Sequence, residues 1–173
     1  MKIIASVLPA DSGSICLYEK SVKEVTAYRS QIGYVPQTIA LSERLSVYQN
    51  LAFWASIRGL KGQALKQEIN RVAASFQVDG FLKKRIGHCS GGMARRVNLA
   101  AGLLGNPHLV LLDEPISGID EENRLLILDA IRALKNQQCI VLMVSHYANE
   151  LSRICDRVLS LHEGKIEASH HAP

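Results

Sequence analysis

Two adjacent carboxylates, Asp113 and Glu114, end an apolar run that begins at Leu109. Continuous apolar runs are typical of buried strands in parallel sheets, and the ligands of open α/β folds bind where such strands end. There, Asp113 could hold the Mg²⁺ of a nucleotide through a bound water, while Glu114 orients or deprotonates the water that attacks a terminal phosphate. Taken alone, the segment is equally well interpreted as a strand that ends in a solvated acidic turn closed by Pro115.

A second segment, Ser90-Gly91-Gly92, precedes a helical stretch from Met93 to Leu104. Ser90 is a good N-cap residue, and Gly105-Asn106-Pro107 stops the helix. Glycines are poor helix formers in a first turn, but they let a phosphate approach free backbone amides at the positive end of the helix dipole. By itself the tripeptide is more simply an ordinary capped helix. The acidic strand that follows directly favours the phosphate site.

With these two segments the chain resembles the nucleotide-binding subunits of ATP-binding cassette (ABC) transporters, from about Met1 to Glu167. Asp113 and Glu114 match the family's Walker B aspartate and catalytic glutamate. Ser90-Gly91-Gly92 resembles the signature motif, which in the family caps the γ-phosphate of ATP held by the opposite subunit. Cys89 and Met93 depart from the commonest signature, and methionine in that place is familiar in export-type members.

Three further motifs match in the family's order. Gln37 resembles the glutamine of the Q-loop, which senses the metal and attacking water and faces the membrane subunit. Ser117 to Asp120 resembles the D-loop, and His146 the switch histidine that contacts the γ-phosphate. The resemblance implies a catalytic role for Glu114 and His146. It implies Mg²⁺ binding by Asp113 and Gln37. The nucleotide-binding residues that it implies are Gln37, Ser90, Gly91, Gly92 and Asp120.

The phosphate-binding loop Gly-x-x-x-x-Gly-Lys-Ser/Thr occurs nowhere in the 173 residues, although its amides and lysine normally hold the β- and γ-phosphates. Residues Met1 to Gly13 resemble the family's helix just after that loop, with the turn that follows it. We therefore expect Met1 to be an internal methionine of a longer frame or the start of a genuine truncation. Loss of the strand before the loop would leave backbone groups unpaired and weaken the core.

The resemblance implies an α/β, P-loop NTPase-like (ABC ATPase) fold: a three-layer core with a mainly parallel sheet and an inserted helical subdomain, lacking the N-terminal strands and the P-loop. Residues 1–173 would form a single truncated domain. Within it, 46–87 would be the helical subdomain that docks on the transmembrane partner, and 1–45 plus 88–173 the core.

Chain breakers and apolar periodicity locate the individual elements. Ser46 and Gln49 form a capping box for a helix that runs to about Arg58. The other predicted elements are strands at Ser14–Glu19 and Gln31–Val35, helices at Gln63–Phe76, Glu121–Lys135 and Ala148–Cys155, a buried parallel strand at Cys139–Val144, and a hairpin of Arg157–His162 with Lys165–Ala168.

Composition narrows the function classes. At 47% hydrophobic and 21% charged residues, the chain is globular and long enough for one domain. The net charge of +4 is dispersed, so nucleic-acid binding has little support. No apolar run approaches the roughly 20 residues that span a bilayer. Four scattered cysteines without a Cys-x-x-Cys pair indicate reduced thiols in a cytoplasmic protein.

These features predict an ATP-binding subunit that uses ATP and Mg²⁺ to drive transport, with export the favoured direction. Its expected partners are a transmembrane permease and a second nucleotide-binding subunit, in a homo- or heterodimer peripheral to the cytoplasmic face of the membrane. Because the phosphate loop is absent, the chain is expected to be inactive alone. Two alternatives stay open: a non-catalytic subunit that donates its signature motif or regulates a heterodimer, and a degenerate fragment without function.

Overall fold

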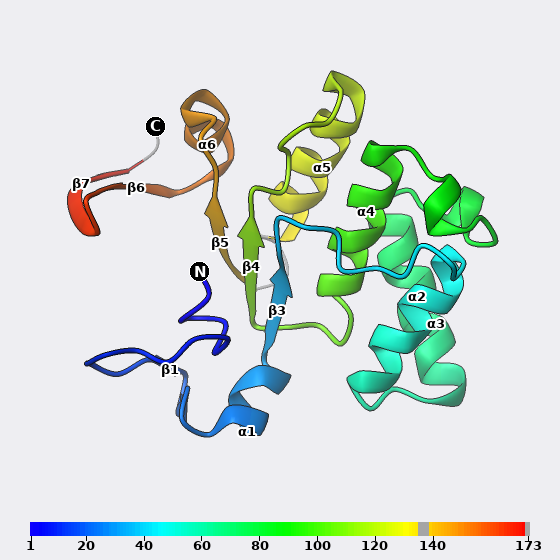
Figure 1. Cartoon of the computed structure of the whole chain (residues 1–173), viewed down its shortest axis with the longest axis horizontal. Helices are drawn as coiled ribbons and strands as arrows, with labels where there is room; N and C mark the ends of the chain where they lie inside the picture. Colours follow the sequence, from blue (N-terminus) through cyan, green and yellow to red (C-terminus); the bar gives the residue numbers. More distant parts are fainter. Residues whose placement is uncertain (135–138, 172–173) are drawn as a thin grey trace.

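A computed structural model of the chain describes residues 1–134 and 139–171 (Figure 1). Its centre is a three-stranded parallel sheet of order β3-β4-β5, which agrees with the predicted α/β fold. These strands are β3 (Ile32–Val35), β4 (Leu109–Asp113) and β5 (Ile140–Val144). Each is short and rich in β-branched or leucine side chains, as strands of buried parallel sheets are.

The register of the sheet aligns the carboxyl ends of all three strands. Val35 of β3 pairs with Leu112 of β4, and Asp113 pairs with Val144 of β5. Polar residues that follow the strands therefore meet at one edge of the sheet, where the arrowheads lie in Figure 1.

The two faces of the sheet pack against different layers. Val110 and Leu112 of β4 are buried in the larger apolar cluster with four helices, whereas Leu109 and Leu111 are buried in a smaller cluster with the N-terminal segment. This alternation follows from the two-residue period of a strand. The helices are α2 (Val47–Ile57), α3 (Gly62–Ser75), α4 (Gly91–Gly102) and α5 (Glu121–Ala133).

The N-terminal layer is less regular than predicted. Instead of a helix, residues 1–8 form hydrogen-bonded turns, such as the bond from the Ala5 amide to the Met1 carbonyl at 2.9 Å. Pro9 and Gly13 leave too few residues for a helix to propagate. The strand predicted at 14–19 is reduced to a two-residue pairing. This layer contains β1 (Cys16–Leu17), β2 (Lys20–Ser21) and α1 (Val25–Ser30).

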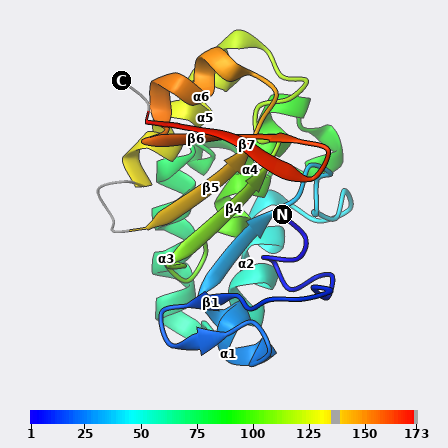
Figure 2. The ribbon, with the colours of Figure 1, turned by 90° about the vertical axis from the view of Figure 1, so that its left-hand side faces the viewer.

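Strand β5 is parallel, as predicted, but the prediction that it is buried was wrong. Ile140 and Val144 are 53% and 44% exposed, because within the described residues β5 pairs only with β4 and forms an edge of the sheet. The C-terminal hairpin is a separate two-stranded sheet (Figure 2). It comprises β6 (Arg157–His162) and β7 (Lys165–His171), and follows α6 (Ala148–Ile154).

Between the Q-loop and the signature segment the chain is helical. The predicted capping box is present, because the Ser46 hydroxyl accepts the Gln49 amide at 3.1 Å and the Gln49 side chain accepts the Ser46 amide at 2.9 Å. Two 3₁₀ turns, η1 (Asp79–Phe81) and η2 (Ile86–His88), complete the segment. Lys135, the predicted end of α5, lies outside the described residues. No helix in the described ranges has the length and apolar character to cross a bilayer.

Glu68 joins α3 to the loop after α4. Its carboxylate accepts two hydrogen bonds from Arg71, at 2.7 and 2.8 Å, and one from the Gly105 amide at 2.7 Å. Burial alone would raise the pKa of Glu68, but these hydrogen bonds outweigh it and lower the pKa below its ordinary value. A carboxyl group with a lowered pKa stabilises the fold above its unfolded-state pKa and loses this contribution as the pH falls through its folded-state pKa.

We therefore expect Glu68→Gln to lower the free energy of unfolding by about 1–3 kcal/mol at pH 7. The difference from the wild type should shrink as the pH falls and vanish once Glu68 is protonated. Urea unfolding at several pH values measures this. Glu43→Gln, at an exposed side chain, is the control. An effect of Glu68→Gln that did not change with pH would contradict the assignment.

Candidate active site

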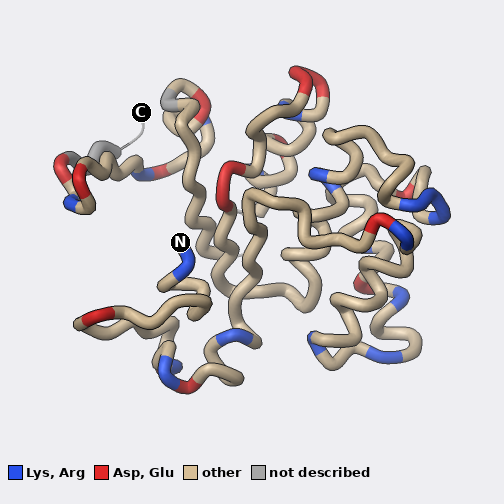
Figure 3. Tube along the Cα trace, viewed as in Figure 1, with Lys and Arg blue, Asp and Glu red and all other residues tan. Residues whose placement is uncertain are grey.

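Four predicted site residues lie at the carboxyl edge of the sheet. Gln37 follows β3, Asp113 and Glu114 close β4, and His146 follows β5. The acid pair forms the red segment at the end of β4 in Figure 3. The strand register thus places at one edge of the sheet residues that are up to 109 positions apart in sequence (146 − 37).

Glu114 and His146, which follow neighbouring strands, are in contact. His146 Nδ1 lies 2.9 Å from Glu114 Oε2, and the glutamate side chain is only 15% exposed against 61% for the histidine. The two atoms are not aligned as a hydrogen bond, so among the described residues the buried Oε2 has no hydrogen-bond donor. A buried carboxylate oxygen without a donor is costly. The contact with His146 is therefore the interaction in this structure that can offset the cost.

The backbone of Glu114 directs this side chain. Its amide continues the sheet by donating to the Val144 carbonyl at 3.0 Å. Its φ of 50° lies in the left-handed region that favours glycine. A non-glycine residue there stores strain of about 1–3 kcal/mol, and such residues cluster at functional sites.

Asp113 lies beside Tyr34, which sequence analysis did not select. Tyr34 pairs with Leu111, two residues before Asp113, so both side chains project from the same face of the sheet. The pKa of Tyr34 is raised, first by burial and then by the charge and hydrogen bond of Asp113. The sequence alone carries no signal for this pair, because the two side chains share a face only through the register of β3 with β4.

The residues present fit a nucleotide-bound Mg²⁺. In the ranges that the structure describes, no group of three or more His, Cys, Asp or Glu side chains could cage a metal. Mg²⁺ does not need such a cage, because it commonly binds one or two carboxylates together with substrate phosphates and waters. Asp113, with its neighbouring phenol, offers one such carboxylate. The exposed Gln37 side chain offers a second oxygen.

Ser90 caps α4, as predicted, since its Oγ accepts the Met93 amide at 3.2 Å. No group in the described residues accepts the hydroxyl's own hydrogen, which leaves this hydrogen available to a phosphate oxygen. The two glycines differ. A Cβ at Gly91 would have no atom within 4 Å, so its backbone is open to a ligand, whereas Gly92 is buried against Asn123.

Gly92 is therefore required by packing within the chain. A Cβ there would lie 2.5 Å from Asn123, and hydrogen bonds to Asp120 restrain the Asn123 side chain. We expect Gly92→Ala to lower the free energy of unfolding by about 1–3 kcal/mol. Gly91→Ala, the matched control, should be neutral or slightly stabilising. Thermal or urea unfolding compares the two, and equal effects would contradict this packing role.

Asp120 caps α5 by accepting the Asn123 amide at 2.9 Å. The hydrogen bonds from the Asn123 amide and side chain lower the pKa of Asp120. The structure thus gives Asp120 a helix-capping role, while its predicted nucleotide contact stays a prediction.

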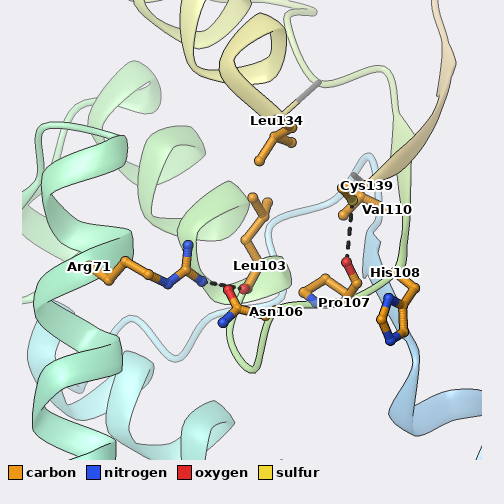
Figure 4. Close-up of a pocket in the computed structure, with 8 residues that line it drawn as sticks. All are labelled: Arg71, Leu103, Asn106, Pro107, His108, Val110, Leu134 and Cys139. Carbon is orange, nitrogen blue, oxygen red and sulfur yellow. Dashed lines mark hydrogen bonds between the residues drawn. The ribbon is translucent and has the colours of Figure 1, made fainter. Parts of the chain in front are cut away.

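A cavity of about 390 Å³ lies at the opposite end of the sheet (Figure 4). In it the Cys139 thiol donates to the Pro107 carbonyl at 3.3 Å, and Arg71 donates to the Leu103 carbonyl at 3.0 Å. Burial raises the pKa of Cys139, which keeps the thiol protonated and unreactive. None of the predicted site residues lines this cavity.

A larger groove of about 590 Å³ lies between α1, α2, α4 and β3. Tyr34, Trp54, Ile57 and Arg58 are among its lining residues. Ile57 is 60% exposed, and the neighbouring Phe53 is 55% exposed. An apolar patch of this kind, beside the loop that carries Gln37, indicates an interaction site.

A parallel sheet with an acid pair and a histidine at its carboxyl edge defines a P-loop NTPase-like domain. The sequence model described as "ABC transporter" matches residues 1–117. The chain therefore belongs to the ABC transporter family.

Individual relatives support this family assignment. The linearmycin resistance ATP-binding protein LnrL of Bacillus subtilis is 34% identical over 97% of this chain, and the probable multidrug ABC transporter ATP-binding protein YbhF of Escherichia coli is 32% identical over 96%. The chain spans only 54% of LnrL and 29% of YbhF. A solved ATP-binding subunit of an ABC transporter superposes with a TM-score of 0.86 at 25% identity, covering 98% of this chain and 71% of that one. The dimeric cassette MJ0796 shares the fold, with a TM-score of 0.88 at 21% identity, covering 99% and 78%.

Proposed function

We propose that this chain is the ATP-binding subunit of a membrane transporter and couples ATP hydrolysis to transport, with export the favoured direction. The observation that carries the proposal is the partly buried Glu114 carboxylate, which lies 2.9 Å from His146. Both residues lie at the carboxyl edge of the sheet, next to Asp113. LnrL and YbhF, named as resistance and multidrug proteins, support the direction. The direct test is Mg²⁺-dependent ATP hydrolysis by the transporter that contains the chain, before and after substitution of Glu114.

Each residue has a separate task in this reaction. Glu114, whose side chain keeps 15% exposure at the edge of the sheet, orients the attacking water and accepts its proton. His146 holds that carboxylate in position and presents its exposed ring edge to the terminal phosphate. Asp113 and Gln37 supply oxygen ligands to Mg²⁺, which when bound neutralises developing phosphate charge.

We assign the groove at Trp54 and Ile57 to the transmembrane permease, peripheral to the membrane on its cytoplasmic side. A helix of the permease with an apolar face would bury the exposed side chains of α2. We expect Ile57→Asp to weaken binding of the permease about 30- to 100-fold, as for loss of a central interface residue.

The control is Ile166→Asp, at an equally exposed isoleucine (64%) on the C-terminal hairpin. Affinity purification of the chain with its permease, followed by titration of the purified partners, measures both variants. If Ile166→Asp disrupted the complex and Ile57→Asp did not, the hairpin and not the groove would be the docking surface.

A second candidate function is donation of the signature motif to a partner subunit in a heterodimer. The open backbone at Gly91 and the available Ser90 hydroxyl favour it, because neither needs a phosphate loop from this chain. Co-purification with a homologue that carries such a loop, lost on Ser90→Arg, would support this function. Purification of the chain only with copies of itself would count against it.

A further inference from the structure

The segment after β3 that carries Gln37 is tied to α4, the helix that begins after Ser90. Arg95 Nη1 donates to the Gln37 carbonyl at 2.6 Å. Asn98 Oδ1 accepts the Ala40 amide at 3.0 Å, and Asn98 Nδ2 donates to the Pro36 carbonyl at 3.5 Å. Two side chains of one helix thus hold both ends of residues 36–40.

Both side chains are buried, with 9% exposure for Arg95 and 3% for Asn98. Arg95 even leaves its Nε without a hydrogen-bond partner in the described part of the chain. Burying such groups costs free energy that an apolar side chain of similar size would avoid. Helix packing alone therefore does not explain them, whereas their bonds to the segment 36–40 do.

The helix has little freedom to move relative to β3. A Cβ added at Gly33 of β3 would overlap the carbonyl oxygen of Gly102 in α4, and one at Gly102 would overlap Val35. Backbones this close move together. Ser90 at the start of the helix is then in a fixed position relative to the strand, and the bonds from Arg95 and Asn98 extend this rigid unit to Gln37.

We propose that Arg95 and Asn98 are positioning residues that hold Gln37 in fixed register with the signature helix. The same segment also contacts the groove, because Trp54 Nε1 donates to the Ala40 carbonyl at 3.3 Å. A partner that moves Trp54 would therefore act on Gln37 and on the start of α4 together. This last step rests on the proposed docking of the permease, whereas the positioning itself does not.

Arg96 provides a matched control for the positioning role. It is the next residue of α4, its Nε is also buried without a partner, and its Nη1 donates to the carbonyls of Phe76 and Gln77 at 3.2 and 2.8 Å. Arg95→Gln and Arg96→Gln should thus destabilise the fold to a similar extent. They differ in the segment that each releases.

The first experiment is amide hydrogen exchange on the full chain. Arg95→Gln should accelerate exchange of residues 37–40 at least tenfold, as expected for loss of a hydrogen bond from a charged donor. Arg96→Gln should accelerate exchange near residues 76–78 and leave 37–40 unchanged. Asn98→Leu, which retains the volume but removes both hydrogen bonds, should reproduce the effect at 37–40. The proposal would be overturned if residues 37–40 exchanged in Arg95→Gln at the wild-type rate, or if Arg96→Gln accelerated their exchange as much as Arg95→Gln does.

The second experiment repeats the measurement on the complex with the permease. In the wild type, docking should slow exchange both at 37–40 and at the first turn of α4, residues 91–94. In Arg95→Gln the effect at 37–40 should persist and that at 91–94 should be lost. If docking still slowed exchange at both 37–40 and 91–94 in Arg95→Gln, the proposed link between these segments through Arg95 would be overturned. If docking slowed exchange at neither segment in the wild type, docking in the groove would be refuted. The exchange measured on the free chain would still decide the positioning role.

Discussion

Replacing Glu114 with glutamine is expected to lower kcat for Mg²⁺-dependent ATP hydrolysis about 10²- to 10⁴-fold in the transporter that contains this chain, which is the contribution of a positioned general base. The amide has nearly the shape of the carboxylate, so it can occupy the same site at φ 50° but cannot accept the proton of the attacking water. Because binding of ATP does not use this proton, KM should change little.

The control is Glu122→Gln, at an exposed acid in the first turn of α5, which should leave kcat within about twofold. Ser90→Arg completes the comparison, because it adds bulk and charge to the signature helix without altering the sheet edge. If Glu114→Gln left hydrolysis unchanged while Ser90→Arg abolished it, Glu114 would have no catalytic role. The chain would then serve a partner's site only through its signature motif.

Much of the fold follows from local sequence signals. The capping box at Ser46, the N-cap at Ser90 and the apolar run before Asp113 each specify an element whose geometry is set within a few residues. Gln37 and His146 could be selected only through the order of motifs, because a lone glutamine or histidine carries no such signal. Their placement at the edge that carries Glu114 depends on the register of three strands, which no local pattern determines.

Other features depend on contacts between distant segments and were missed. The exposure of β5 is set by which strands are available to pair with it, not by its own apolar residues. Tyr34 gains its relation to Asp113 only through the pairing of β3 with β4. Likewise, Arg95 resembles a surface residue of an amphipathic helix until the segment 36–40 packs over it.

The close approach of α4 to β3 is the least predictable contact, and its loss should have the largest effect on stability. We expect Gly33→Ala to lower the free energy of unfolding by about 3 kcal/mol or more, and the melting temperature by about 6–12 °C for a domain of this size. The added Cβ would overlap the backbone carbonyl of Gly102 and approach Pro107. A backbone atom, unlike the Asn123 side chain beside Gly92, cannot rotate away.

Gly80→Ala is the matched control, because a Cβ at Gly80 would have no atom within 4 Å and its φ is outside the left-handed region. That substitution should be neutral, or stabilising by up to about 1 kcal/mol through the unfolded state. Both substitutions reduce the conformational entropy of the unfolded chain by the same amount. The difference between their free energies of unfolding, measured by calorimetry or urea unfolding, therefore gives the cost of the steric overlap at Gly33. Equal stabilities would mean that α4 can withdraw from β3 at little cost, and that Gln37 is not fixed by the body of the helix.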